Sequence, residues 1–134
     1  MARLDRRLAE AEAALATFDE AVATASQSLI ERDSAILRMI YTFEALWKAC
    51  QQLLGDREDT EVASPNTAIR AARRLGWLSN ADAEAAIKIG RDRNLAVHMY
   101  RGQIGEEIAE RLVDHAAVLR RWLDALQERA ADGT

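Results

Sequence analysis

The chain has 134 residues, one cysteine and a formal net charge of −4, from 22 acidic and 18 basic residues. This length predicts a single domain over residues 1–134, with its core at about 4–126 and a frayed tail at 130–134. The lone Cys50 excludes an internal disulfide, and the acidic balance argues against a protein that coats nucleic acid non-specifically. Any contact with RNA is therefore expected to be local.

The first ten residues are highly charged, so we expect no signal peptide. No apolar run approaches the roughly 20 residues that a membrane span requires. Together these features predict a cytoplasmic protein that does not bind a membrane.

Apolar residues recur at steps of three and four, which predicts amphipathic helices throughout. The first helix is expected at about 4–25 and the second at about 29–54. Gly55 is the natural stop of the second helix, and the polar stretch 56–63 is expected to be a loop.

Ser64 and Pro65 predict the start of a third helix, with serine as the N-cap and proline at the first helical position. This helix is expected to end at Gly76. Asn80 is the predicted N-cap of the fourth helix.

A turn containing Gly102 and Gly105 is expected next, followed by a fifth helix at about 104–129. The sequence thus predicts an all-α antiparallel bundle of about five helices. More apolar surface is present than one such bundle needs, which favours a homodimer. The apolar residues in excess are Leu29, Leu37, Leu46 and Leu53.

Several conspicuous side chains are interpreted as packing residues because they fall on apolar stripes or stand alone. These are Trp47, Trp77, Trp122, Cys50 and His115. Three further residues are expected to form a solvated face of the third helix with acidic partners: Arg70, Arg73 and Arg74. The chain has no glycine-rich phosphate loop, zinc-ligand spacing or acidic metal cluster, so no metal or cofactor is expected.

The fourth helix ends in a run that combines Arg93, Asn94, His98 and Tyr100, with Arg91 close by. Histidine exchanges a proton near neutral pH, and arginine stabilises a phosphate as negative charge develops on it. The asparagine amide is suited to orient the imidazole or to hold a ribose or phosphate oxygen. These residues are a plausible set for cleaving RNA without a metal.

The spacing of this run raises a geometric difficulty. On an ideal helix Asn94 and His98 share a face, but Arg93 lies about 140° away from His98. The two groups meet only if the helix breaks near Val97 or if a second subunit supplies one of them. We therefore expect a composite cleft at a two-fold axis.

The run Arg93-Asn94-x-x-x-His98-x-Tyr100 resembles the RxxxxHxY motif of HEPN domains, in the branch also called nucleotidyltransferase substrate-binding proteins. Two further blocks resemble the second and third helices of that branch, in the same order and at similar spacing. They are Arg32–Ile40 with Thr42–Lys48, and Ser64–Ala72 with Leu75-Gly76.

The resemblance implies a dimeric helical toxin that cleaves RNA, encoded beside a minimal nucleotidyltransferase (MNT) antitoxin. It carries over Arg93 and His98 as catalytic residues, with Asn94 as a supporting polar residue. Arg91 is a further supporting candidate because of its place on the helix. The resemblance also implies that the antitoxin transfers AMP to Tyr100, where a bulky, negatively charged adenylate would exclude RNA from the cleft. The chain lacks a nucleotidyltransferase active site of its own.

Two other interpretations stay open. In the first, the chain is a non-catalytic substrate-binding subunit of a two-component nucleotidyltransferase, and Arg93, Asn94 and His98 bind a nucleotide without cutting. In the second, it is a helical dimerisation module whose site has decayed.

Overall fold

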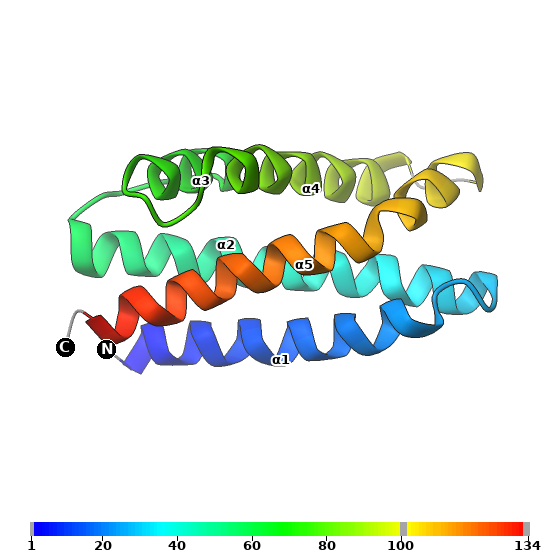
Figure 1. The fold of residues 1–134 in the computed structure, drawn as a ribbon, viewed down its shortest axis with the longest axis horizontal. Helices are drawn as coiled ribbons and strands as arrows, with labels where there is room; N and C mark the ends of the chain where they lie inside the picture. Colours follow the sequence, from blue (N-terminus) through cyan, green and yellow to red (C-terminus); the bar gives the residue numbers. More distant parts are fainter. Residues whose placement is uncertain (1, 100–101, 133–134) are drawn as a thin grey trace.

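The structure is a computed structural model that describes residues 2–99 and 102–132, and within these residues it contains five helices and no strand (Figure 1). The predicted all-α bundle is therefore confirmed. The helices are α1 (Ala2–Thr24), α2 (Leu29–Glu58), α3 (Pro65–Arg74), α4 (Asn80–Met99) and α5 (Gly102–Asp132).

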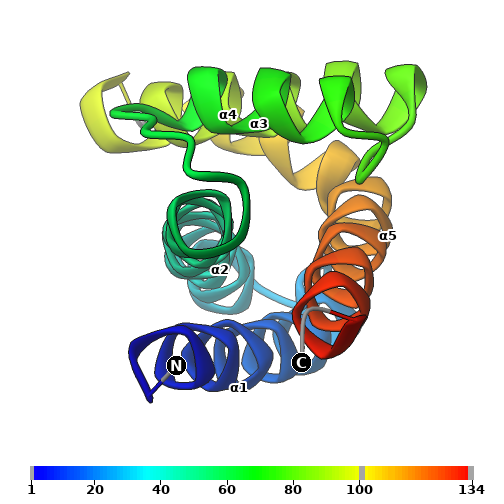
Figure 2. The ribbon, with the colours of Figure 1, turned by 90° about the vertical axis from the view of Figure 1, so that its left-hand side faces the viewer.

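The central helix is α2, which packs against all four others (Figure 2). Helix α1 lies on one side of it, α3 and α4 lie on the opposite side, and α5 runs beside it from α4 to α1. This arrangement corrects one expectation, because Leu46 and Leu53 are fully buried within the chain. A helix that packs against four others needs more than one apolar stripe, so these residues are not surplus.

The second helix is longer than predicted. It passes through Gly55 and ends at Glu58, so the first part of the expected loop is helical. The chain leaves the helix at Asp59, which adopts a left-handed conformation (φ 50°) and donates its backbone N–H to the Leu54 carbonyl. Aspartate tolerates this conformation better than most residues, so it replaces glycine as the stop signal.

The predicted start of α3 is confirmed, because the Ser64 hydroxyl accepts from the Thr67 backbone N–H in a capping box. The predicted cap of α4 is wrong by one residue. The Ser79 hydroxyl, and not Asn80, accepts from the Asp82 backbone N–H at 3.0 Å. Serine and asparagine are similarly good caps, so composition alone did not distinguish them.

The last helix is also longer than predicted. It begins at Gly102 rather than 104, so Gly105 lies inside it and is buried. It continues to Asp132, so residues 130–132 of the expected frayed tail are helical. No helix in the described ranges is both long and apolar enough to cross a membrane.

Phe43 of α2 lies at the centre of the packing between α2, α4 and α5. Its ring meets the Trp122 ring edge-on at 6.2 Å, and both side chains are fully buried. A Cβ added at Gly90 would lie 3.0 Å from the Phe43 ring. Glycine at this position therefore allows α4 to approach α2 closely.

Cys50 is also fully buried in this core. Burial raises the pKa of its thiol to about 12, because the surroundings cannot solvate a thiolate.

Two glycine-to-alanine variants test the close approach of α4. Alanine is favoured over glycine in a helix by about 1 kcal/mol, and a Cβ at Gly55 would meet nothing within 4 Å. We expect Gly55→Ala to raise the free energy of unfolding by up to about 1 kcal/mol. Gly90→Ala should lower the free energy of unfolding by about 1 kcal/mol. The added methyl group would clash with the Phe43 ring, which the core holds in place, and this cost outweighs the higher helix propensity of alanine. Urea denaturation measures both, and equal stabilisation by the two changes would contradict the packing described above.

Candidate functional site

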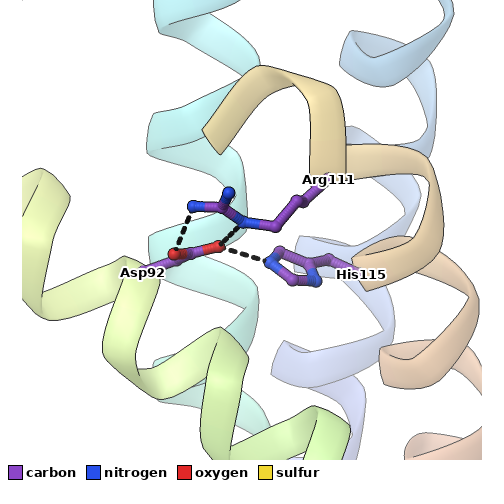
Figure 3. Close-up of polar contacts among 3 residues, drawn as sticks. All are labelled: Asp92, Arg111 and His115. Atoms are coloured by element: carbon purple, nitrogen blue, oxygen red, sulfur yellow. Dashed lines mark hydrogen bonds and ion pairs between the residues drawn. The ribbon is translucent and has the colours of Figure 1, made fainter. Parts of the chain in front are cut away.

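Two consecutive residues of α4 bind it to different neighbouring helices. Asp92 faces α5, where its carboxylate accepts two hydrogen bonds from the Arg111 guanidinium, both at 2.8 Å (Figure 3). It also accepts one from His115 Nε2 at 2.7 Å. The Asp92 and His115 side chains are almost fully buried, whereas Arg111 extends to the surface.

The Asp92 carboxyl stays ionised although it is buried. Burial by itself raises its pKa, but the hydrogen bonds and charges of His115 and Arg111 outweigh burial and lower the pKa from 3.8 to about 2. A buried carboxylate with this many partners fixes the rotation of α4 about its own axis.

Arg93 faces α2 and forms an ion pair with Glu44. The same Glu44 carboxylate accepts from the Trp47 indole N–H at 3.3 Å, and Arg93 Nη1 donates to Asn94 Oδ1 at 2.7 Å. The Arg93 and Glu44 side chains are 26% and 33% exposed, so the pair lies at the surface boundary and not in the core. Within this chain, the Arg93 guanidinium is already matched by a carboxylate.

His98 lies in the last turn of α4 and is exposed. The helix runs without interruption through Val97 to Met99, so of the two alternatives raised by the spacing, a break near Val97 is not observed. The Arg93 and His98 side chains therefore leave α4 about 140° apart, and one protomer does not bring them together. Tyr100 lies outside the described residues.

Arg91 and Asn94 are exposed and line a pocket of about 260 Å³, to which Arg93 also contributes. The pocket lies where the start of α3 meets α4 and α2. Its other lining residues are Phe43, Ser64, Pro65, Asn66, Ile87 and Gly90. The three predicted site residues that precede His98 thus meet at one concave surface.

Apolar side chains remain exposed beside the Arg93–Glu44 pair. Leu37 and Tyr41 precede Glu44 on the same face of α2 and are 43% and 50% exposed. Val97 follows Arg93 by one turn and is 55% exposed. Helices α2 and α4 are antiparallel (Figure 1). Leu37 and Tyr41, which precede Glu44, and Val97, which follows Arg93, are therefore expected on the same side of the ion pair.

Sequence reasoning missed Asp92, Arg111 and Glu44 as determinants of this region. For Asp92 a signal was present, because it falls on the same helical stripe as the buried Ile89 and Ala96. A carboxylate on a buried stripe needs a partner, and His115 on the buried stripe of α5 was a candidate.

Of the other sequence-based interpretations of single residues, some are confirmed and one is wrong in part. The three tryptophans, Cys50 and His115 are buried, as predicted for packing residues. The three arginines of α3, Arg70, Arg73 and Arg74, are exposed as expected. Among the described residues, however, none of them forms the expected ion pair with an acidic side chain. Throughout residues 2–99 and 102–132, no three His, Cys, Asp or Glu side chains converge as a metal site requires.

Comparison with protein families gives one match. The family described as "Nucleotidyltransferase substrate binding protein like" matches residues 6–128. A comparison with curated proteins finds no match.

Solved structures share this fold. A crystal structure of a Thermus thermophilus protein is 43% identical, with a TM-score of 0.82, and the similarity covers 87% of this chain and 98% of that one. A tri-AMPylated Shewanella oneidensis HEPN toxin, solved in complex with an MNT antitoxin, is 15% identical with a TM-score of 0.78. That similarity covers 93% of this chain and 96% of the toxin.

A third structure, of the toxin–antitoxin pair MntA-HpeT, is 16% identical with a TM-score of 0.77 over 93% of this chain and 97% of that one. At 15–16% identity the two toxin structures establish a common fold.

Replacing Asp92 tests whether it clamps α4 to α5. Asp92→Asn leaves the His115 and Arg111 donors facing an amide, so we expect a loss of about 3 kcal/mol in the free energy of unfolding. Asp114→Asn is the matched control, because Asp114 is an exposed carboxyl on α5 and its loss should cost less than about 0.5 kcal/mol. Equal effects of the two variants would rule out a clamp at Asp92.

The pH dependence of stability gives a second measurement on Asp92. Its pKa is lowered in the folded state, so its contribution is fully present above pH 3.8 and is lost as the pH falls through about 2. The shift corresponds to about 2 kcal/mol. The difference in stability between wild type and Asp92→Asn should therefore shrink between pH 4 and pH 2, as measured by urea denaturation. A constant difference over that range would contradict the assignment.

Proposed function

Because the chain belongs to the nucleotidyltransferase substrate binding protein-like family, we propose that it is the toxin of a HEPN/MNT toxin–antitoxin pair. Its activity is endoribonucleolytic, metal-independent and carried by Arg93 and His98. The observation that carries the proposal is the complete Arg93-Asn94-x-x-x-His98-x-Tyr100 run, with His98 exposed on α4 of the fold that HEPN toxins share.

The His98 imidazole moves a proton to or from the 2′-hydroxyl or the leaving oxygen of the cleaved bond. The Arg93 guanidinium stabilises the phosphate as its negative charge increases. The Asn94 amide orients the His98 imidazole or holds a ribose or phosphate oxygen. Arg91 adds an exposed positive charge one turn before Asn94 and draws RNA toward the site.

The active species is a homodimer with composite clefts, in which Arg93 of one protomer acts with His98 of its partner. An uninterrupted α4 separates the two groups within a protomer, so a second copy must supply the missing one. Leu37, Tyr41 and Val97 provide an apolar contact beside Arg93, which supports this arrangement.

The partner is a minimal nucleotidyltransferase that transfers AMP to the Tyr100 hydroxyl. Tyr100 follows His98 by two positions in the sequence, so an adenylate there brings a base and a negative phosphate to the mouth of the cleft. It excludes RNA by bulk and by like-charge repulsion. The toxin and antitoxin in the structure of the Shewanella oneidensis complex, in which the toxin is AMPylated, support this assignment of roles.

Expression in cells tests the toxin and its control together. Wild type alone should arrest growth, and His98→Ala should not, because the general acid–base group accounts for about 10²- to 10⁴-fold in rate. Co-expression of the neighbouring nucleotidyltransferase should rescue cells from wild type but not from Tyr100→Phe, which has no hydroxyl to modify. Purified protein and a panel of RNAs provide the biochemical measurement.

The rival function is a non-catalytic substrate-binding subunit. The description of the matching family, which names a substrate binding protein, favours this alternative. A subunit would neither arrest growth nor depend on His98 for any RNA cleavage. Equal inactivity of wild type and His98→Ala toward varied RNAs would establish this alternative over the toxin.

The composite cleft is tested by a charge in the apolar contact. Leu37→Glu should convert the dimer to a monomer in sedimentation experiments and reduce RNA cleavage at least tenfold, because it buries a carboxylate in the interface. Val113→Glu is the matched control, since Val113 is 68% exposed but lies on α5. Mixing Arg93→Ala with His98→Ala should restore cleavage in heterodimers. A dimer that survives Leu37→Glu, or inactive mixtures, would contradict the composite cleft.

A further inference from the structure

The pocket between α3, α4 and α2 has a lining of two chemical kinds. Its apolar part comes from Phe43, Pro65, Ile87 and Gly90. Its polar part comes from Ser64, Asn66, Arg91, Arg93 and Asn94. Neither His98 nor any acidic side chain is among its described lining residues. The volume of about 260 Å³ is slightly below the range of about 300–1,000 Å³ typical of ligand sites, which suits one small planar ligand with an anionic group.

The polar groups of this pocket differ in how far they are already used. The Ser64 hydroxyl is taken by the capping box with Thr67, and Asn94 Oδ1 accepts from Arg93. Within the described ranges, the Arg91 guanidinium and the Asn66 amide have no ion pair or side-chain hydrogen bond. These two groups are therefore available to a ligand.

The net charge of the pocket depends on Glu44, although Glu44 is not among its lining residues. Since Glu44 pairs with Arg93, the uncompensated charge among the lining residues is the single positive charge of Arg91. One phosphodiester of RNA carries one negative charge, which matches Arg91. A polyphosphate would bring charges for which the pocket has no partner.

We propose that this pocket is a subsite for one nucleotide unit of RNA, with its phosphate on Arg91 and its base against the apolar lining and the Asn66 amide. An asparagine amide both donates and accepts, as the edge of a nucleobase requires, and a base offers a flat apolar face to Pro65 and Ile87, which are partly exposed. The subsite rests on the proposed function for its substrate class. It adds α3 to the RNA-binding surface, outside the motif on α4.

The test is a titration of the full-length protein with AMP at about pH 5, where the AMP phosphate carries mostly one negative charge, as a phosphodiester does, and binding is followed by NMR or calorimetry. Asn66→Leu keeps a similar volume but removes the amide, so we expect about a tenfold loss in AMP affinity. Asn80→Leu is the matched control, since Asn80 is an exposed asparagine at the start of α4 and should change the affinity less than twofold. Arg91→Gln should weaken AMP binding about tenfold, while Arg73→Gln on α3 should not. Thermal melts of all four variants establish that they are folded.

Further probes identify the ligand class. Adenosine and inorganic phosphate should each bind at least tenfold more weakly than AMP, because each satisfies only one part of the pocket. Equal affinity for phosphate and AMP would reduce the site to an anion site and overturn the proposal. An ATP affinity well above that for AMP would also overturn it, since the pocket has one free positive charge.

His98→Ala separates this proposal from the proposed function. His98 does not line the pocket, so AMP binding should be unchanged in this variant. If the protein binds AMP with the expected pattern but cleaves no RNA, the subsite stands and the toxin activity fails. If it cleaves RNA but Asn66→Leu and Asn80→Leu have the same affinity for AMP, the subsite is wrong and the activity stands.

Discussion

The rotation of α4 about its axis depends on one buried carboxylate. Asp92 meets His115 and Arg111 of α5 at 2.7 and 2.8 Å, and this geometry leaves little freedom for the helix to turn. Because successive residues of a helix point about 100° apart, fixing Asp92 also fixes the direction of Arg93 toward Glu44 on α2. The site is therefore positioned by a contact on a different side of the helix from the one that meets α2.

The consequence for chemistry is a guanidinium that is compensated before any substrate arrives. A phosphate that binds Arg93 competes with Glu44 or joins it, so the resting chain holds this guanidinium in a neutralised state. Arg91, one turn earlier than Asn94, keeps its charge exposed. In an acidic protein this difference disfavours coating of any polyanion, and under the proposed function it restricts RNA contact to a small region.

Much of the fold could be predicted from apolar spacing. A helix with a single buried face, such as α5, carries one apolar stripe in its sequence, and that stripe identifies the buried face. Helix α2 could not be predicted as well, since it packs against four helices and its second apolar row, with Leu46 and Leu53, suggested surplus surface. The motif residues of α4 could be found from their chemistry and spacing. The Glu44 ion pair could not, because it joins residues 49 positions apart and nothing local requires it. The pocket at Asn66 depends likewise on how α3 lies against α4.

The burial of Cys50 has a practical consequence for spectroscopy. Thiol reagents attack the thiolate, and a thiol with a pKa of about 12 inside a packed core presents almost none of it. A second cysteine introduced at a solvent-facing position would therefore accept a fluorophore or spin label selectively, with the native thiol left in place. Modification of Cys50 itself would require the helices around it to separate, so its rate of alkylation reports how often the bundle opens.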